Sequence, residues 1–499
     1  MACTTILVGK KASYDGSTLV ARNEDSPSGE YTPKKMIAVS SKNHPTRYKS
    51  VLGHFEVELP ETALSYTLTP DAVPTIGVWG ACGINEKNVA MSATETITSN
   101  DRVLGADPLV EYQEAQGQPG EADYQAEKLG GISEEDMVSL VLPYIHSARE
   151  GVLRLGQLLE EYGTSEMNGI AFQDVEEIWW LETIGGHHWI AKRVPDEAYV
   201  VMPNQQGIDS FDFEDAFGQQ KDHLCSKDMR EFIKDNFLDL SLESEFQARL
   251  AFGSYSDADH VYNTPRAWVM GRYFNFNTFK WDGPDADFTP TSDNIPWSFV
   301  PERKITIQDI KTILSNHYQG TPYDPYGKSG DSSLRGIYRS IGVNRNNFLG
   351  LTQIRPYLPE SIRSLQWMAF GSNVFNAMIP LYTQVTKIPD YLANTGARVN
   401  TDNIYWASRI VGALADAHYY ATETAIERYQ LAVAKQAVQL LKENEQVLLA
   451  DPSQDSLALC EKANQNIVDM LKKETDQVLD KVLYLASNGM KNAFSRSDN

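Results

Sequence analysis

Short runs of apolar and β-branched residues dominate the first hundred positions of the chain and predict β-strands. Residues 4–9 and 18–22 form two such runs, separated by the turn signal Asp15-Gly16-Ser17. Residues 3–22 are therefore predicted to form a β-hairpin. Further runs of the same kind predict strands at 35–40, 63–68, 77–81 and 89–93.

Helical periodicity begins at Ser133, where apolar residues recur at i, i+3 and i+4 spacing as far as Ile145. Ser133 and Asp136 have the spacing of a capping pair, and Pro143 predicts a kink. A second helix is expected over 152–162, ending at Gly163. Strands are then predicted at 169–174, 177–183, 189–193 and 198–202.

The rest of the chain alternates short elements before a change of pattern at Thr401. Short helices are predicted at 211–217, 227–237 and 244–252, a capped helix at 306–317, and strands at 349–355 and 364–370. Residues 403–449 and 456–487 form long amphipathic helical stretches, separated by Asp451-Pro452. We expect an α+β domain over residues 3–400, with helical insertions, and a helical extension over 401–499 packed on it.

Charge and cysteine content limit the possible functions. The 499 residues carry a net charge of -23, which argues against nucleic acid and anionic membranes as partners. We expect a cytoplasmic protein, because the sequence has no secretory leader and no apolar run long enough to span a membrane. No structural metal is expected, since neither the cysteines nor the histidines have metal-ligand spacing, and the absence of a nucleotide-binding glycine motif disfavours a Rossmann fold. The long helices near the carboxy terminus favour a homo-oligomer.

Cys3, at the head of the first predicted strand, is the candidate nucleophile. A free thiol has a pKa near 8.5 and needs a base and a positive field to react at neutral pH. If Met1 and Ala2 are removed, the α-amine of Cys3, with an ordinary pKa of about 7.7–8.0, supplies that base. Hairpin strands lie about 5 Å apart, so the second strand is predicted to bring Arg22 and Asp25 beside Cys3. The alternative is an unreactive thiol at a frayed terminus.

The cysteine, the hairpin and Arg22-Asn23-Glu24-Asp25 together resemble the cysteine N-terminal-nucleophile (Ntn) hydrolases. These include penicillin V acylases, bile salt hydrolases and, with the greatest likeness, the bacterial dipeptidase A family. The likeness continues at residues 80–96, 177–206, 262–272 and 321–327. It implies a four-layer αββα sandwich and cofactor-free hydrolysis of small peptide substrates.

The resemblance also implies roles for individual residues. Cys3 is the nucleophile, with Arg22 beside its thiolate and Asp25 binding the α-amine. Asn204 resembles the asparagine that donates its side-chain amide to the oxyanion. Arg266 resembles the second arginine of the site, and Arg272 is the rival for that role.

Two features depart from the family pattern. Methionine excision alone leaves Ala2 ahead of Cys3, so removal of Ala2 must be assumed. Glu95 stands near the position where the acylases have an oxyanion asparagine, and an ionised carboxylate does not donate a hydrogen bond. We therefore expect Glu95, or Glu24 as second candidate, to bind the ammonium group of a dipeptide.

Several alternatives remain open from the sequence. Cys82 lies between Ala81 and Gly83 and is a rival nucleophile. His187 and His188 are interpreted as a hairpin tip, because neighbouring residues of a strand face opposite sides and do not share a site. In place of a dipeptidase, the chain could be an acylase of the penicillin V or bile salt type, or a non-enzymatic relative that binds partners.

Overall fold

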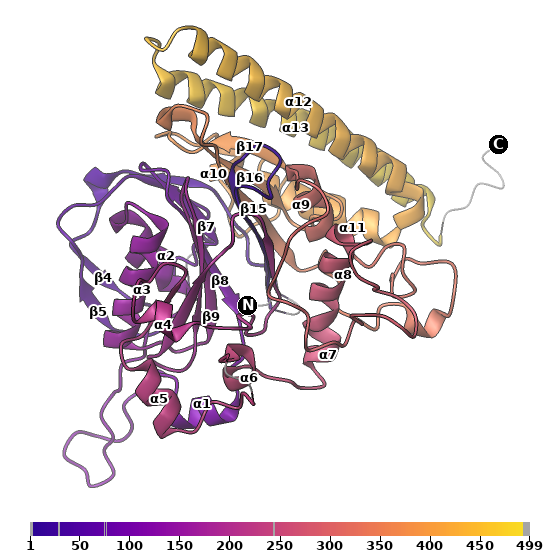
Figure 1. Cartoon of the computed structure of the whole chain (residues 1–499). Helices are drawn as coiled ribbons and strands as arrows, with labels where there is room; N and C mark the ends of the chain where they lie inside the picture. The colour runs from indigo at the N-terminus through magenta and orange to yellow at the C-terminus, as the bar shows by residue number, and fades with distance from the viewer. Residues whose placement is uncertain (1–2, 28–29, 74, 76, 243–244, 493–499) are drawn as a thin grey trace, which may run out of the picture.

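Two antiparallel β-sheets lie at the centre of the computed structural model (Figure 1). The structure describes residues 3–27, 30–73, 75, 77–242 and 245–492. For residues 94 and 95 it describes the backbone and not the side chains. The first sheet has the strand order β14-β12-β1-β2-β15-β16-β17. Its strands are β1 (Cys3–Val8), β2 (Thr18–Asp25), β12 (Tyr199–Met202), β14 (Ser298–Phe299), β15 (Asn346–Ile354), β16 (Ser364–Phe370) and β17 (Ile379–Tyr382). The predicted hairpin is confirmed, with Cys3 opposite Glu24 and Val8 opposite Leu19.

The second sheet has the order β13-β11-β10-β9-β8-β7-β6-β3. Its strands are β3 (Ile37–Val39), β6 (Tyr66–Leu68), β7 (Cys82–Asn85), β8 (Ala90–Thr96), β9 (Asn168–Gln173), β10 (Ile178–Thr183), β11 (Trp189–Arg193) and β13 (His223–Cys225). A separate ribbon pairs β4 (Arg47–Lys49) with β5 (Glu56–Glu58). The strand predicted at residues 77–81 is wrong, because β7 begins only at Cys82.

Apolar side chains from both sheets meet in one buried cluster. Leu7 of β1 and Val20 of β2 lie in this cluster with Trp180 of β10 and Ile190 of β11. Because side chains alternate between the faces of a strand, Cys3 points to the same side of β1 as Leu7. The predicted nucleophile therefore lies on the face of its sheet that is turned toward the second sheet.

Helices α2 (Glu134–Val141) and α3 (Ala148–Tyr162) pack on the outer face of the second sheet. The predicted capping pair is confirmed, since the Asp136 side chain accepts a hydrogen bond of 2.9 Å from the backbone N–H of Ser133. Pro143 lies in a 3₁₀ turn, η2 (Leu142–Tyr144), which follows directly on α2. Gly151 of α3 allows close packing, because a Cβ there would lie 2.3 Å from the Phe172 ring.

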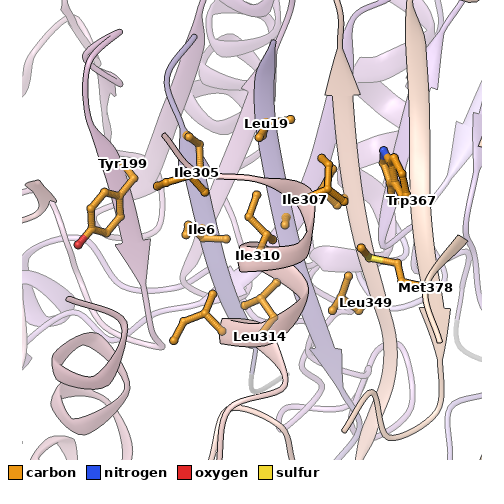
Figure 2. Close-up of a cluster of buried hydrophobic side chains, with 14 of the residues drawn as sticks. Ile6, Leu19, Tyr199, Ile305, Ile307, Ile310, Leu314, Leu349, Trp367 and Met378 are labelled. Atoms are coloured by element: carbon orange, nitrogen blue, oxygen red, sulfur yellow. The ribbon is translucent and has the colours of Figure 1, made fainter. Parts of the chain in front are cut away.

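Helix α9 (Ile307–Leu314) covers the outer face of the first sheet. Figure 2 shows Ile310 and Leu314 of this helix directed at Ile6 and Leu349 of the strands beneath. The predicted cap at Thr306 is confirmed, because its hydroxyl accepts a hydrogen bond of 3.1 Å from the backbone N–H of Asp309.

Helices α11 (Ile404–Ala417), α12 (Tyr419–Ala450) and α13 (Ser456–Asn488) cover the β17 edge of the first sheet, where they pack against side chains of β15–β17. Figure 1 shows α12 and α13 as a long antiparallel pair, drawn in yellow. Tyr382 of β17 and Asn464 of α13 exchange two hydrogen bonds of 2.9 Å. The prediction of a single helix over 403–449 is wrong, because the stretch forms two helices. α11 ends at Ala417, His418 is its C-cap, and α12 begins at Tyr419. No helix in the described part of the chain is both long and apolar enough to cross a membrane.

Helix α8 (Thr264–Phe274) has no counterpart in the sequence prediction. Nine of its eleven residues are buried, including Arg266, so the helix has almost no polar face to produce an amphipathic period. The remaining short elements are α1 (Asp101–Ala106), α4 (Phe213–Ala216), α5 (Met229–Asp235), α6 (Ala248–Phe252), α7 (Asp259–Tyr262), α10 (Asp390–Ala393), η1 (Ser41–Asn43), η3 (Ser332–Leu334) and η4 (Glu360–Ile362).

Candidate active site

Cys3 and Arg22 are in direct contact between the two sheets. The Arg22 guanidinium donates through Nη2 to Cys3 Sγ at 2.9 Å and to Glu134 Oε1 at 2.8 Å. Both Cys3 and Arg22 are buried. Burial alone would lower the pKa of Arg22, but the opposing charges of Cys3, Glu134 and Glu24 raise it above its ordinary value. A fixed positive charge at this distance favours the thiolate form of the cysteine.

Asp25 lies on the opposite side of β2 from Arg22. The two residues are three positions apart, and an odd separation in a strand turns side chains to opposite faces. The Asp25 carboxylate is fully buried and binds the guanidinium of Arg339 and the side-chain amide of Asn346. The structure therefore places Asp25 next to the Cys3–Glu24 strand pair, on the face away from the sulfur.

Asn204 follows β12 and contacts the backbone of Cys3. Its Oδ1 accepts hydrogen bonds from the Cys3 backbone N–H at 3.3 Å and from Arg266 Nη2 at 2.7 Å. Its Nδ2 donates to the Thr96 carbonyl at 2.8 Å. Because a guanidinium only donates, the contact with Arg266 sets the orientation of the Asn204 amide.

Arg266, in the first turns of α8, is the arginine that reaches this group. It is fully buried, and its Nη1 donates to the Cys3 carbonyl and to Thr4 Oγ1, the latter at 2.7 Å. Arg272, two turns further along α8, pairs with Asp282 at 3.1 Å. The structure thus brings Arg266 to Cys3, whereas Arg272 lies at a different place on the helix.

Three charged residues at this site were missed by the sequence analysis: Glu134, Lys34 and Asp71. Lys34 Nζ lies 2.7 Å from Glu24 Oε1 and 2.6 Å from Asp71 Oδ1, and it donates to the Trp79 carbonyl at 2.9 Å. Glu134 stands in the first turn of α2, where its charge also suits the helix dipole. The acidic run at 134–136 was the available signal, but it was interpreted only as helix capping.

Glu24 belongs to this buried charge network, which argues against the predicted substrate role. Its carboxylate is paired with Lys34 and lies 4.0 Å from Arg22. Burial raises the pKa of Glu24 and of Asp71, and the charges of Lys34 and Arg22 oppose the rise at Glu24. A carboxylate already neutralised by Lys34 has little charge left for the ammonium of a substrate.

Glu95 can be placed only by its backbone, because its side chain lies outside the described part of the structure. It occupies β8 opposite Gly169, after an irregularity in strand pairing that begins at Ser92. Its role in substrate binding stays a prediction.

Cys82 is a poor nucleophile in this fold. Its thiol is buried and accepts a hydrogen bond of 3.0 Å from Gln366 Nε2. Burial raises the pKa of Cys82 to about 12, so the thiolate is scarce at neutral pH. Cys225 and Cys460 have pKa values raised to about 12 for the same reason. Within the described residues, no group of three or more His, Cys, Asp or Glu side chains is arranged to hold a metal ion.

His187 and His188 form the predicted hairpin tip between β10 and β11, but the argument that they cannot share a site is wrong. His187 Nδ1 lies 3.0 Å from Asp107 Oδ1, and His188 Nδ1 lies 2.7 Å from Asp107 Oδ2. Both residues precede the strand, so the strict alternation of strand side chains does not apply to them. Their backbone N–H groups also donate to the same Asp107 carboxylate.

We expect Asp107→Asn to lower the free energy of unfolding by about 1–3 kcal/mol at pH 7. Burial alone would raise the pKa of Asp107, but the hydrogen bonds from His188 and His187 lower it below its ordinary value. The stabilisation is therefore complete above about pH 4, the ordinary pKa of an aspartate, and is lost as the pH falls through the lowered pKa. Urea denaturation at pH 7 and at pH 3 measures the difference.

Asp228→Asn is the control for this prediction, because that carboxylate is exposed and lies 3.4 Å from His188 Nε2, on the side of the ring away from Asp107. Its effect is expected to stay within about 0.5 kcal/mol. A destabilisation by Asp107→Asn that is equal at both pH values would contradict the electrostatic explanation.

Comparison with known proteins relates the chain to peptidases. Residues 2–432 match the model of peptidase family C69. The chain is 53% identical, with 100% of both chains covered, to a dipeptidase of Bifidobacterium longum (strain NCC 2705). It is 51% identical, again over 100% of both chains, to a probable dipeptidase A of Streptococcus pyogenes serotype M3 (strain SSI-1). A dipeptidase A of Lactobacillus helveticus is 41% identical, with 96% of each chain covered.

Proposed function

Because this chain belongs to peptidase family C69, we propose that it is a cysteine dipeptidase with Cys3 as its nucleophile. One observation carries the proposal: the Arg22 guanidinium lies 2.9 Å from Cys3 Sγ at a buried strand end. The names of the relatives support dipeptides as the substrate class.

The proposed reaction uses the α-amine that Cys3 acquires when Met1 and Ala2 are removed. The amine takes the thiol proton, the thiolate attacks the peptide carbonyl, and the resulting ammonium protonates the leaving amine. Water, activated by the same amine, then hydrolyses the thioester. The side-chain amide of Asn204, which donates to the Thr96 carbonyl, is proposed to donate to the oxyanion, a contribution of about 3 kcal/mol.

Arg266 and Asp25 are proposed to position the amine. Arg266 holds both the Cys3 carbonyl and the Asn204 oxygen that faces the Cys3 nitrogen. Asp25 neighbours Glu24, the strand partner of Cys3, and is proposed to stabilise the ammonium form. Glu95 is proposed to bind the substrate ammonium.

Removal of Met1 and Ala2 is proposed to free the α-amine of Cys3, a residue that is buried between the sheets. Two facing sheets, with α2 and α3 on the outer face of the second and α9 on the outer face of the first, suit the αββα sandwich of the N-terminal-nucleophile hydrolases. The division of the chain at residue 400 stays a prediction, and the family match continues into α12.

We expect the purified protein to hydrolyse dipeptides about 10⁴-fold more efficiently, in kcat/KM, than penicillin V or glycine-conjugated bile salts. The reason is that a site built to bind an ammonium rejects analogues that lack it, because its own buried polar groups are left unpaired. Release of free amino acids from a dipeptide panel and of products from the acyl amides gives the comparison.

Mass spectrometry of the active protein supplies the accompanying test of the nucleophile. The mature chain is expected to begin at Cys3. Full peptidase activity in protein that retains Ala2 would rule out the α-amine as base. Equal efficiency on both substrate panels would favour the acylase alternative. Absence of activity on both panels would favour the non-enzymatic alternative.

A further inference from the structure

A cavity of 250 Å³ lies between α9 and the first turns of α12, on the outer side of the first sheet. Gln308 and Lys311 of α9 contribute to its wall, as do His317 and, from α12, Tyr419, Glu423 and Glu427. Cys3 points to the opposite side of that sheet, so the cavity is distinct from the candidate active site. Its volume is just below the range of about 300–1,000 Å³ for drug-sized ligands, which suits a small metabolite.

Lys311 places a buried cation in this wall. Its Nζ donates to Ser315 Oγ at 2.8 Å and to the Asn373 carbonyl at 2.6 Å. Both acceptors are uncharged, and among the residues that the structure describes no ion pair of 4.0 Å or less is formed by this ammonium. Burial lowers the pKa of Lys311 to about 7. An ammonium has three donors, so one donor remains for an anionic ligand after these two bonds.

Two carboxylates supply the opposite charge at the same cavity. Glu423 and Glu427 are exposed and stand four residues apart on α12, which places them on one face of that helix. The buried cation belongs to α9 and the exposed carboxylates belong to α12, so the two charges come from different elements. A ligand that satisfies both must carry an anionic and a cationic group a short distance apart.

Aromatic side chains give one side of the cavity a defined shape. Tyr419 stacks on Tyr326, with ring centroids 3.9 Å apart and planes 10° apart. His317 meets Tyr326 edge-on and lies 2.9 Å from Asp324 through Nδ1. These contacts preorganise the wall, and a preorganised site loses less entropy when a small ligand binds.

We propose that this cavity binds a free α-amino acid, with the carboxylate of the ligand at Lys311 and its ammonium at Glu423 and Glu427. The proposal rests on the proposed function in one respect, since free amino acids are the products that a dipeptidase releases. A bound product at a site separate from Cys3 would let the protein respond to the amino acids that accumulate around it.

Titration calorimetry on the full chain with L-leucine tests the proposal, and it does not depend on catalysis. We expect Lys311→Met to weaken leucine binding at least tenfold, because the variant removes the charge that binds the carboxylate. Leucinamide, which lacks the carboxylate, and N-acetyl-leucine, which lacks the ammonium, are expected to bind at least tenfold more weakly than leucine. Lys435→Met is the matched control, since that lysine is exposed on α12 and does not contribute to the cavity wall.

The paired variant Glu423→Gln with Glu427→Gln keeps the test informative if Lys311→Met does not fold. Both positions are exposed, and the pair is expected to weaken binding of leucine but not of N-acetyl-leucine. The affinity for leucine should also fall above pH 7, because anion binding favours the charged form of Lys311. Tyr419, His317 and the two glutamates are the other titratable groups in the wall.

The outcomes separate this proposal from the dipeptidase proposal. Leucine binding that is unchanged in Lys311→Met, or that is displaced by dipeptide in Cys3→Ala protein, would assign the ligand to the active site and overturn the second site. Absence of binding at millimolar leucine would also overturn it. If leucine binds as expected but no dipeptide is hydrolysed, only the proposed activity fails.

Discussion

Replacing Cys3 with alanine is expected to lower kcat for dipeptide hydrolysis by about 10⁶-fold, the scale of loss when a protease nucleophile is removed. The variant keeps the α-amine, Arg22 and Asn204 but has no atom that attacks the carbonyl. Stability should change little, because the substitution removes only one atom from a buried site. Initial rates with a dipeptide and circular dichroism of both proteins give the comparison.

Cys225→Ala and Cys82→Ala are the controls for this experiment. Cys225 lies in β13 at the edge of the second sheet, far along the strand order from the catalytic group, and its loss should leave kcat unchanged. Cys82 is buried with a raised pKa, and its loss should likewise spare activity. Full activity in Cys3→Ala, or a complete loss in Cys82→Ala with an intact fold, would transfer the nucleophile to Cys82.

Replacing Lys34 with methionine is expected to lower the free energy of unfolding by about 3–5 kcal/mol, the usual cost of breaking a buried ion pair on one side. Lys34 has 0% exposure and pairs with both Glu24 and Asp71, which are also buried. Without the ammonium, these carboxylates must be protonated or remain buried and uncompensated. Urea denaturation at pH 7 measures the loss.

Lys35→Met is the matched control for Lys34, since the neighbouring lysine is only half-buried. Its effect is expected to stay within about 0.5 kcal/mol. Adding Glu24→Gln to Lys34→Met should restore part of the lost stability, because the double variant has one buried carboxylate fewer. Equal effects at Lys34 and Lys35 would show that the buried network contributes nothing.

Local sequence patterns were sufficient to predict most of the longer helices and strands. The β1–β2 hairpin and the capped helix at Thr306 were predicted because their signals lie within a few residues of each other. The break at His418 was missed because Ala417-His418-Tyr419 contains neither proline nor glycine. Helix α8 was missed because tertiary burial surrounds it and removes its polar face.

For the active site too, some contacts were expected from the sequence and others were not. Arg22 was expected beside Cys3 from hairpin pairing and family likeness, and the structure places it there at 2.9 Å. The pairing of Lys34 with Glu24 and Asp71 joins residues from separate segments of the chain, and no helical or strand periodicity connects them. The histidine argument failed because it assumed strand geometry for two residues of a turn.

The sequence by itself determined the strand that begins at Cys3 and the arginine on the neighbouring strand, because these depend on short-range periodicity and turn chemistry. It also supplied Cys3 as the nucleophile candidate, through the α-amine that this residue can carry and the family likeness. Only the tertiary structure decided that Arg266 rather than Arg272 reaches Cys3, that Glu24 is paired with Lys34, and that Lys311 lines a cavity with the glutamates of α12. The physical reason is that charge pairing and burial depend on distances through space, and the packing of sheets and helices sets those distances between segments that are separated along the chain.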